Sequence, residues 1–577
     1  MPKVDPITFA VVQKKLISIA NGMLDIASSS GVSSFIGQVR DCSFAIVDAD
    51  SGIIAQSIGI LLFLSSLGPA TQNCIDAIGK DNIEPEDVII ANLPDITGSH
   101  SSDAVLFTPI FYRGKIFGYA TTKAHWQDMG AKNTYPTDAT NIYEEGLRIP
   151  PVKLFKKGIL QKEIIDIIRW NSRAPDQVWG DIQAQIAGCR YAERQVIALL
   201  DKYGLEIVNE IIHEMYDYSE RITRLAIDEM PEGTWTAEDF IDNNGIDLDK
   251  PIKTKVTVTI KGSDITLDFT GSDPEQRGPM NGLWVTTLSG ARMAIKALTT
   301  PKLPANEGCN RPVKVIAPRG CVYNAGPTAP SFLCGNVAST ILELVNKALW
   351  KIVPDKIPAC SGGDVCGGGF FGIDPRTGKQ WATLSSPAIG QGGDFFADGD
   401  SCSGHHSIGG GGGVNVEIWE ASYPLFVEKM ELIPDSGGAG KHRGGLGMRL
   451  DVRTLGPATL FRFIEKAKAP HWGVDGGKEG LRNYAHVKSK DQSELETLKI
   501  SGLELSEGDR VIAIGGGGGG YGNPMERDIE AVRRDVINGY ISVESARQDY
   551  GVVIDPQSYE VNIAATRKLR NTPDNTG

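Results

Sequence analysis

The chain has 577 residues, of which 41% are hydrophobic and 22% charged, an ordinary globular composition that is long enough for several domains. Its formal net charge of −13 argues against nucleic acid as a partner, because nucleic-acid binding needs a basic surface. No apolar run reaches the ~18 residues of a membrane-spanning helix, and nine cysteines without a Cys-x-x-Cys pair favour reduced thiols in a cytoplasm.

The first predicted elements are a helix and a hairpin. Asp5-Pro6 is typical of a helix start, because Asp caps free N–H groups and proline fits the first helical position. Apolar residues then recur at helical spacing, so we predict an amphipathic helix over residues 6–27. Residues 44–47 and 53–55 flank a turn and predict a β-hairpin, and residues 69–78 predict a second helix.

A turn-rich loop over residues 92–103 lies between two strand-like apolar runs and carries His100 and Asp103. His125 follows another strand-like run, and Asp41 precedes an apolar strand. Imidazole nitrogens and carboxylate oxygens on loops at strand ends are the donors of a divalent metal site. A single histidine on a loop is also typical of a hydrogen-bonded surface residue, so the pattern alone leaves both interpretations open.

The middle of the chain is mainly helical. Residues 143–155 contain two consecutive prolines, which exclude a helix and predict an extended surface segment. Residues 162–230 predict helices, interrupted around Asn171 to Pro175. Near residue 231 the spacing of apolar residues changes from a helical to an alternating pattern, which indicates a boundary between two regions of the chain.

Beyond that boundary the pattern mixes strands and helices. Alternating apolar residues over 253–270 predict a β-hairpin, and residues 285–298 predict a helix. Residues 336–350 predict another helix, with Asn336 as its cap. Residues 568–577 are predicted to be a disordered tail.

Glycine clusters mark the last third of the chain, at residues 367–369, 392–393, 409–413 and 515–520. None carries the Lys-Ser/Thr of a nucleotide P-loop, so we predict no ATP site in this chain. The last cluster is interpreted as a close-packed turn or flexible lip rather than an anion-binding loop. His405-His406 are a candidate metal or acid–base pair, but neighbouring side chains of a strand point apart, so joint binding of one ion is not predicted.

These patterns predict a mixed α/β (α+β) multi-domain protein. The expected regions are an N-terminal α/β region with the metal site (1–160), a helical segment (161–230), an α+β region (231–358), a glycine-rich β-rich region (359–525) and C-terminal helices with a tail (526–577).

Several motifs, in order, resemble the hydantoinase B / 5-oxoprolinase family, which includes the large (alpha) subunit of acetone carboxylase. They are the 92–103 loop ending in His-x-x-Asp, the second histidine His125, and the glycine-rich string over residues 434–447. The family pattern has an acidic residue after the asparagine and two glycines before the first histidine. This chain has Asn92-Leu93-Pro94 and Gly98-Ser99 there, so its neighbouring substrate contacts are expected to differ.

The resemblance implies a set of functional residues. Asp41, His100, Asp103 and His125 are the expected ligands of a divalent metal, with Zn, Mn or Fe compatible with this mixed nitrogen and oxygen set. Asp128 is expected to orient a ligand histidine or act as a base.

One later segment also matches the family. In residues 143–155, Glu145 is a candidate catalytic residue that, with Arg148, would line a polar cleft.

The resemblance also implies a two-component, ATP-dependent enzyme. A hydantoinase A-type ATPase partner binds ATP and phosphorylates the amide oxygen of a small cyclic amide, and this chain completes hydrolysis at its metal. The expected assembly is a heterotetramer with two copies of each subunit. Substrates would be lactams such as caprolactam, hydantoins or 5-oxoproline. Two alternatives are a ketone carboxylase subunit that uses bicarbonate and a non-catalytic scaffold for an ATPase.

Overall fold

The computed structural model of the protein describes residues 5–363, 367–409 and 415–570. They form a mixed α/β structure with four sheets, as the sequence predicts. Part of the glycine cluster at 409–413 and most of the expected C-terminal tail lie outside the described residues. Within the described part of the chain, no helix combines the length and the apolar character needed to span a bilayer.

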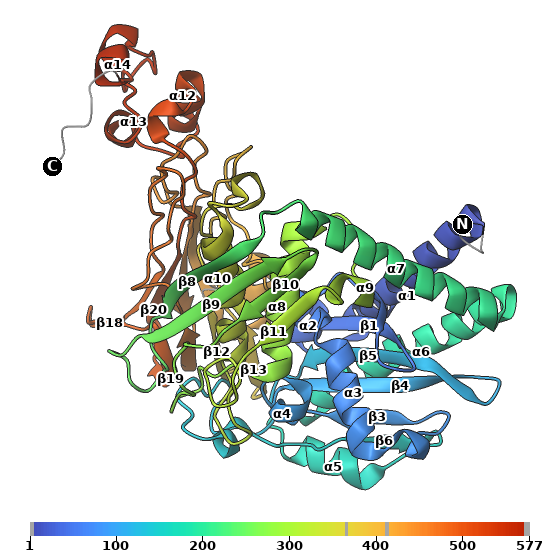
Figure 1. Cartoon of the computed structure of the whole chain (residues 1–577). Helices are drawn as coiled ribbons and strands as arrows, with labels where there is room; N and C mark the ends of the chain where they lie inside the picture. Colours follow the sequence, from blue (N-terminus) through green and yellow to red (C-terminus); the bar gives the residue numbers. More distant parts are fainter. Residues whose placement is uncertain (1–4, 364–366, 410–414, 571–577) are drawn as a thin grey trace.

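The N-terminal part is an antiparallel seven-stranded sheet covered by helices on both faces (Figure 1). Its strands, in spatial order, are β2 (Ile53–Gln56), β1 (Cys42–Asp48), β5 (Lys115–His125), β4 (Asp103–Tyr112), β3 (Val88–Ala91), β6 (Val152–Lys156) and β7 (Ile159–Leu160). The helices are α1 (Pro6–Ser30), α2 (Leu61–Leu64), α3 (Leu67–Ile78), α4 (Pro94–Thr97), α5 (Lys162–Trp170), α6 (Pro175–Tyr203) and α7 (Leu205–Asp228).

Strand β1 shows why both faces must be covered. Phe44 and Ile46 pack with α1 and α6, whereas Ala45 and Val47 pack with α2 and α3 on the opposite face. Successive side chains of a strand point to opposite faces, so a run that is apolar at every position needs two cores. The result is a rigid sheet whose strand ends can hold functional side chains in fixed positions.

The middle part is a four-stranded sheet in the order β11 (Val313–Ile316), β10 (Asp264–Asp268), β9 (Ile252–Lys261) and β8 (Gly233–Ile241). Its apolar face packs against α8 (Trp284–Thr299) and α10 (Cys334–Leu349). The same core includes Phe63 from the N-terminal part and Phe463 from the C-terminal part. The three parts therefore meet around one shared core.

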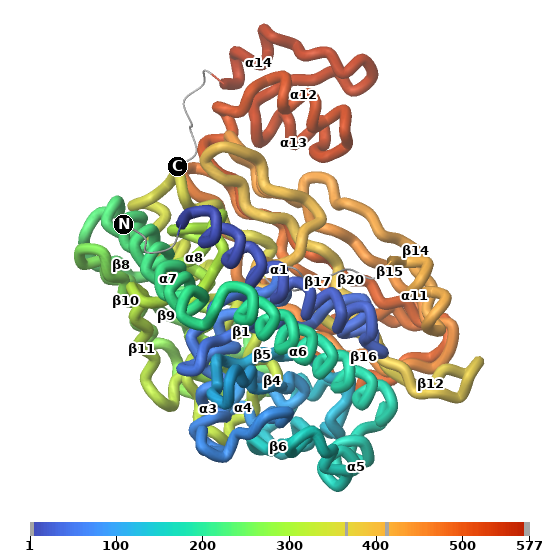
Figure 2. The backbone as a smooth tube through the Cα atoms, turned by 90° about the vertical axis from the view of Figure 1, so that its right-hand side faces the viewer, coloured from blue at the N-terminus to red at the C-terminus, as the bar shows by residue number. Residues whose placement is uncertain are grey.

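The C-terminal part is a sandwich of two sheets whose inner faces share one core. One sheet has the order β13 (Gln380–Leu384), β12 (Gly367–Ile373), β16 (Ala458–Phe463) and β19 (Lys499–Leu505). The other has the order β14 (Leu425–Leu432), β15 (Met448–Thr454), β20 (Arg510–Gly515), β17 (Tyr484–Lys488) and β18 (Glu494–Glu496). Three short helices, α12 (Ile529–Ile537), α13 (Val543–Gln548) and α14 (Ile563–Arg570), lie together at one end of the molecule (Figure 2).

The glycine run at residues 515–520 packs backbone against backbone. A Cβ atom on Gly517 would lie 1.9 Å from the carbonyl oxygen of Ser436, and one on Gly518 would lie 1.9 Å from that of Gln391. The N–H groups of Gly518 and Gly519 donate to backbone carbonyls at 3.0 Å and 2.7 Å. These amides are used inside the fold, so the interpretation as a close-packed turn is confirmed.

Several local predictions are confirmed, and two are wrong. The predicted helix at 6–27 is α1, and the hairpins at 44–55 and 253–270 are β1–β2 and β9–β10. Asn336 is not a cap, because α10 begins at Cys334 after Leu333, and no side chain caps it. Residues 143–155 are not simply an extended surface segment.

The 143–155 segment contains a tight turn followed by a strand. A 3-10 turn spans Ile142–Glu145, and β6 begins at Val152. The side chain of Glu145 is fully buried.

Candidate metal centre at the end of an apolar cavity

Two neighbouring strands bring the predicted ligands together. Strands β4 and β5 are antiparallel, and their register places Asp103, the first residue of β4, opposite His125, the last residue of β5. His100 lies in the turn before β4, where its carbonyl accepts a hydrogen bond from the N–H of Asp103 at 2.9 Å. The N–H of His125 donates to the carbonyl of Asp41 at 3.0 Å, just before β1 begins. All four residues therefore lie at one end of the sheet.

Three of the four side chains are close enough to hold one ion. One possible ligand atom from each of His100, Asp103 and His125 lies within 4.8 Å of the others. His125 Nδ1 lies 2.9 Å from one carboxylate oxygen of Asp103, and His100 Nε2 lies 3.5 Å from the other. Asp103 and His125 are buried, and His100 is nearly so.

Burial and charge give His100 and Asp103 the protonation states of metal ligands, whereas the hydrogen bond to Asp103 and the charges of Asp103 and Asp41 outweigh burial and raise the pKa of His125. Burial lowers the pKa of His100 to about 4, so at neutral pH its ring nitrogens carry no positive charge. The pKa of Asp103 is lowered to about 2, because the two histidines and a hydrogen bond from Ser99 outweigh the opposing effect of burial. A neutral imidazole beside a carboxylate is a donor set that fits a divalent transition metal.

Asp41 lines the same cavity but is not in the group of three. Burial raises the pKa of Asp41 to about 6, with His125 opposing this rise and the charge of Asp103 adding to it. The residue before it, Arg40, has a left-handed φ of 57° and ends a short π-helix over Phe35–Val39. This turn directs the chain into β1 and sets Asp41 beside His125.

The altered loop of this chain positions the ligands through two neighbouring residues. Gly98 has φ 75°, and a Cβ atom there would lie 2.3 Å from Cβ of Val285, so only glycine fits. The hydroxyl of Ser99 donates to the carboxylate of Asp103. The Gly98-Ser99 pair therefore gives Asp103 a hydrogen bond that a second glycine could not supply.

The structure places Asp128 and Glu145 behind the candidate ligands. Asp128 forms an ion pair with Arg173, whose Nε lies 3.1 Å from both carboxylate oxygens. Glu145 accepts hydrogen bonds from the backbone N–H groups of Ser331 and Phe332 at 2.6 Å and 2.8 Å. Neither acid is among the described residues that line the cavity.

Glu145 is connected to the candidate centre through Phe332. The ring of Phe332 stacks on the ring of His100, with centroids 4.4 Å apart and planes inclined by 16°. Burial raises the pKa of Glu145 to about 8, although the two N–H donors oppose this rise. Glu145 therefore bonds the backbone of the residue whose ring stacks on His100.

Two aromatic residues near the centre have no signal in the sequence. Phe332 stacks on His100, and the hydroxyl of Tyr135 lies 3.1 Å from Nε2 of His125. Tyr135 also stacks on Phe461 of β16, with centroids 4.3 Å apart. Both Tyr135 and Phe332 lie outside regular elements, so no periodicity marks them.

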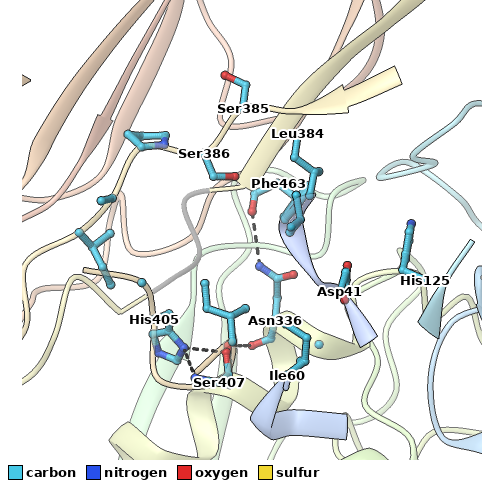
Figure 3. Close-up of a pocket in the computed structure, with 18 of the residues that line it drawn as sticks. Asp41, Ile60, His125, Asn336, Leu384, Ser385, Ser386, His405, Ser407 and Phe463 are labelled. Atoms are coloured by element: carbon cyan, nitrogen blue, oxygen red, sulfur yellow. Dashed lines mark hydrogen bonds between the residues drawn. The ribbon is translucent and has the colours of Figure 1, made fainter. Parts of the chain in front are cut away.

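A cavity of about 490 Å³ extends from the candidate centre toward the C-terminal sandwich (Figure 3). Its lining includes the four predicted ligands at one end and His405 with Ser407 at another. Figure 3 shows Asn336 between Asp41 and His405. Much of the remaining wall is apolar and includes Leu62, Phe63, Leu384, Ile389, Ile408, Met448, Leu450 and Phe463.

The fold and this site define a mixed α/β protein with a candidate metal centre at the end of a largely apolar cavity. Residues 5–524 match the Hydantoinase B/oxoprolinase family, and the chain belongs to that family. It is 33% identical to the caprolactamase subunit beta of Pseudomonas jessenii, over 99% of this chain and 100% of that one.

Solved structures agree with this assignment. The crystal structure of the ATP-dependent caprolactamase from Pseudomonas jessenii superposes with a TM-score of 0.92 and 31% identity, covering 99% of this chain and 100% of that one. Nucleotide-free acetone carboxylase superposes with a TM-score of 0.89 and 20% identity, over 98% of this chain and 82% of that one. The second likeness concerns the fold.

Proposed function

We propose that this chain is the hydrolytic subunit of a two-component, ATP-dependent cyclic amide hydrolase. The observation that carries the proposal is the donor set of His100, Asp103 and His125 at the end of an apolar cavity. It occurs in a chain that aligns over its whole length with the beta subunit of a caprolactamase. The substrate class is a small cyclic amide, such as a lactam, a hydantoin or 5-oxoproline.

The division of labour follows from amide chemistry. An unstrained amide resists hydrolysis, and phosphorylation of its oxygen turns that oxygen into a leaving group. The proposed partner, an A-type ATPase subunit, supplies this phosphorylation. The last glycine segment supports this division, because Gly518 and Gly519 use their amides in hydrogen bonds inside the fold. We expect a heterotetramer with two copies of each subunit.

The proposed ligands are Asp41, His100, Asp103 and His125. A bound Zn, Mn or Fe ion would lower the pKa of water and polarise the electrophilic carbon. The chain's own residues hold this set in place: Ser99 donates to Asp103, and Phe332 stacks on His100.

Asp128 is proposed to keep the loop after His125 in position through Arg173, because the pair joins that loop to the start of α6. Glu145 is proposed to position Phe332 through its two backbone hydrogen bonds. The cavity wall beyond the ligands would hold the hydrocarbon part of the ring and exclude bulk water.

The test is to purify the chain with its ATPase partner and measure ATP-dependent ring opening of lactams, hydantoins and 5-oxoproline. The proposal expects opening of a cyclic amide that requires both subunits and ATP. Bicarbonate-dependent carboxylation of a ketone would instead identify a carboxylase subunit. Unchanged activity of the complex after substitution of His100 and His125 by Ala would identify a scaffold.

A further inference from the structure

A second group of metal-binding side chains lies apart from the proposed centre. Glu343 projects from α10, and His405 and His406 lie in a turn after residue 402. One possible ligand atom from each lies within 4.8 Å of the others. The residues are on a turn rather than a strand, and their ring centroids are 4.5 Å apart. The expectation that neighbouring histidines point apart is therefore wrong here.

Two polar atoms of this group are buried without a partner. Glu343 and His405 are each 1% exposed. Within the described part of the chain, Oε2 of Glu343 and Nε2 of His405 make no hydrogen bond. A buried polar atom without a partner costs about 1–3 kcal/mol, and a buried carboxylate costs more. Two such atoms in one group point to a ligand that satisfies both.

The surroundings hold the three side chains as a metal site would. The N–H and the hydroxyl of Ser361 donate to Oε1 of Glu343 at 3.2 Å and 2.7 Å. Ser407 holds the His405 ring through Nδ1, which lies 2.8 Å from its hydroxyl and accepts a hydrogen bond from its backbone N–H at 3.2 Å, so that Nε2 faces the group. Outer hydrogen bonds of this kind orient ligand histidines in metalloproteins.

A buried cation also lies near the group. Lys466 pairs with Asp239 at 3.0 Å, and its charge acts on both Glu343 and His405. His406 Nε2 lies 3.1 Å from Oε1 of Glu343. This contact between His406 and Glu343 still leaves Nε2 of His405 without a partner.

We propose that Glu343, His405 and His406 form a second binding site for a divalent transition metal, separate from the His100 centre. Two imidazoles and one carboxylate favour ions such as zinc, manganese, iron or cobalt over magnesium and calcium. The site rests on its own geometry and does not depend on the proposed hydrolase activity.

A metal ion at this second site would hold part of the cavity wall in a fixed position. His405 and Ser407 line the cavity, whereas Glu343 belongs to α10 behind them. The carbonyl of Ser407 also accepts a hydrogen bond from the N–H of Leu62 at 3.0 Å. An ion on Glu343 therefore joins the turn, α10 and the N-terminal part where the three meet.

The first test uses the full-length chain and Co²⁺ as the probe. The His100→Ala/His125→Ala variant removes the proposed first centre, and it should still bind one equivalent of Co²⁺. Adding His405→Ala removes a direct ligand, so it should weaken the remaining binding by more than the ~10–100-fold that loss of an outer hydrogen-bond partner costs. His213→Asn, an exposed histidine on α7, is the matched control and should change nothing.

The second test needs no variant. Anomalous diffraction from wild-type crystals soaked in Zn²⁺ should show two peaks per chain, one beside His405 and one beside His100. A single peak beside His100, or unchanged Co²⁺ binding after His405→Ala, would overturn the second site and leave the proposed hydrolase intact. Loss of ring-opening activity in every assay, with a peak still beside His405, would overturn only the proposed function.

Discussion

The two candidate centres differ in how the chain assembles them. Asp103 and His125 are 22 residues apart and face each other across one pair of strands. Glu343 and His406 are 63 residues apart and join a helix to a turn of another part of the molecule. The position of ligands on adjacent strands depends on strand register, whereas the position of ligands on distant parts depends on how those parts pack. The first arrangement can be predicted from the sequence, and the second cannot.

The largest expected effect is the loss of ring-opening activity when the ligands of the first centre are removed. The His100→Ala/His125→Ala variant removes two proposed ligands, and loss of a catalytic metal costs several kcal/mol of transition-state stabilisation. We expect ATP-dependent ring opening by the complex to fall by about 1000-fold or more, with ATP binding by the partner retained. Steady-state kinetics of the purified complex measures this. The His213→Asn variant, treated in parallel, should keep wild-type kcat.

A second prediction concerns the buried acid behind the first centre. The pKa of Glu145 is raised from 4.5 to about 8 in the folded chain, so the folded state holds its proton more tightly than the unfolded state. Its contribution to stability is therefore fully present below pH 4.5 and is lost as the pH rises toward 8. The loss should be on the order of a few kcal/mol.

Glu145→Gln tests this contribution because it keeps an acceptor oxygen for Ser331 and Phe332. Denaturant unfolding at a series of pH values should show a falling free energy of unfolding for the wild type. In the variant, the free energy of unfolding should fall less steeply with pH over the same range. An identical pH dependence in both proteins would mean that Glu145 is not held protonated by the fold.

A third prediction distinguishes a positioning role from a catalytic role for Asp128. Asp128→Asn breaks the ion pair with Arg173, and we expect a loss of about 2 kcal/mol of unfolding free energy. Arg173→Met removes the other partner, so it should change kcat by the same factor as Asp128→Asn. A kcat reduced by about 100-fold in Asp128→Asn alone would instead make Asp128 an acid or base in the reaction.

The smallest expected effect concerns the second centre. Ser407→Ala removes the hydroxyl contact to Nδ1 of His405 and keeps the backbone hydrogen bond and all three proposed ligands. Loss of such an outer partner should weaken Co²⁺ binding at this site by about 10-fold. Competition with a chromophoric chelator measures the change. Binding at the His100 centre should stay constant, so a change there would show that the two sites are not separate.

Much of the fold could be predicted because its signals are local. Asp5-Pro6 marks the start of α1, and alternation over residues 253–270 gives the β9–β10 hairpin. Asn336 is a good capping residue, so the sequence predicts it as the cap, but α10 begins two residues earlier, at Cys334, next to Leu333 of the shared core. Local preference is a weak guide where a helix end is buried.

The candidate site was predicted in part, for the same reason. The positions of His100, Asp103 and His125 follow from one loop and two adjacent strands. Tyr135 and Phe332 come from irregular segments that only the packed molecule brings to the histidines. His405 and His406 were assigned to a strand, and the turn that brings them onto Glu343 has no pattern of its own.

The most direct test of the central claim is a metal-removal experiment on the complex of this chain with its ATPase partner. Cyclic amide opening should stop when a chelator strips the metal, and it should return when Zn²⁺, Mn²⁺ or Fe²⁺ is added to the wild type but not to His100→Ala/His125→Ala. Full turnover by the metal-free complex, or by this chain alone without nucleotide, would contradict the account.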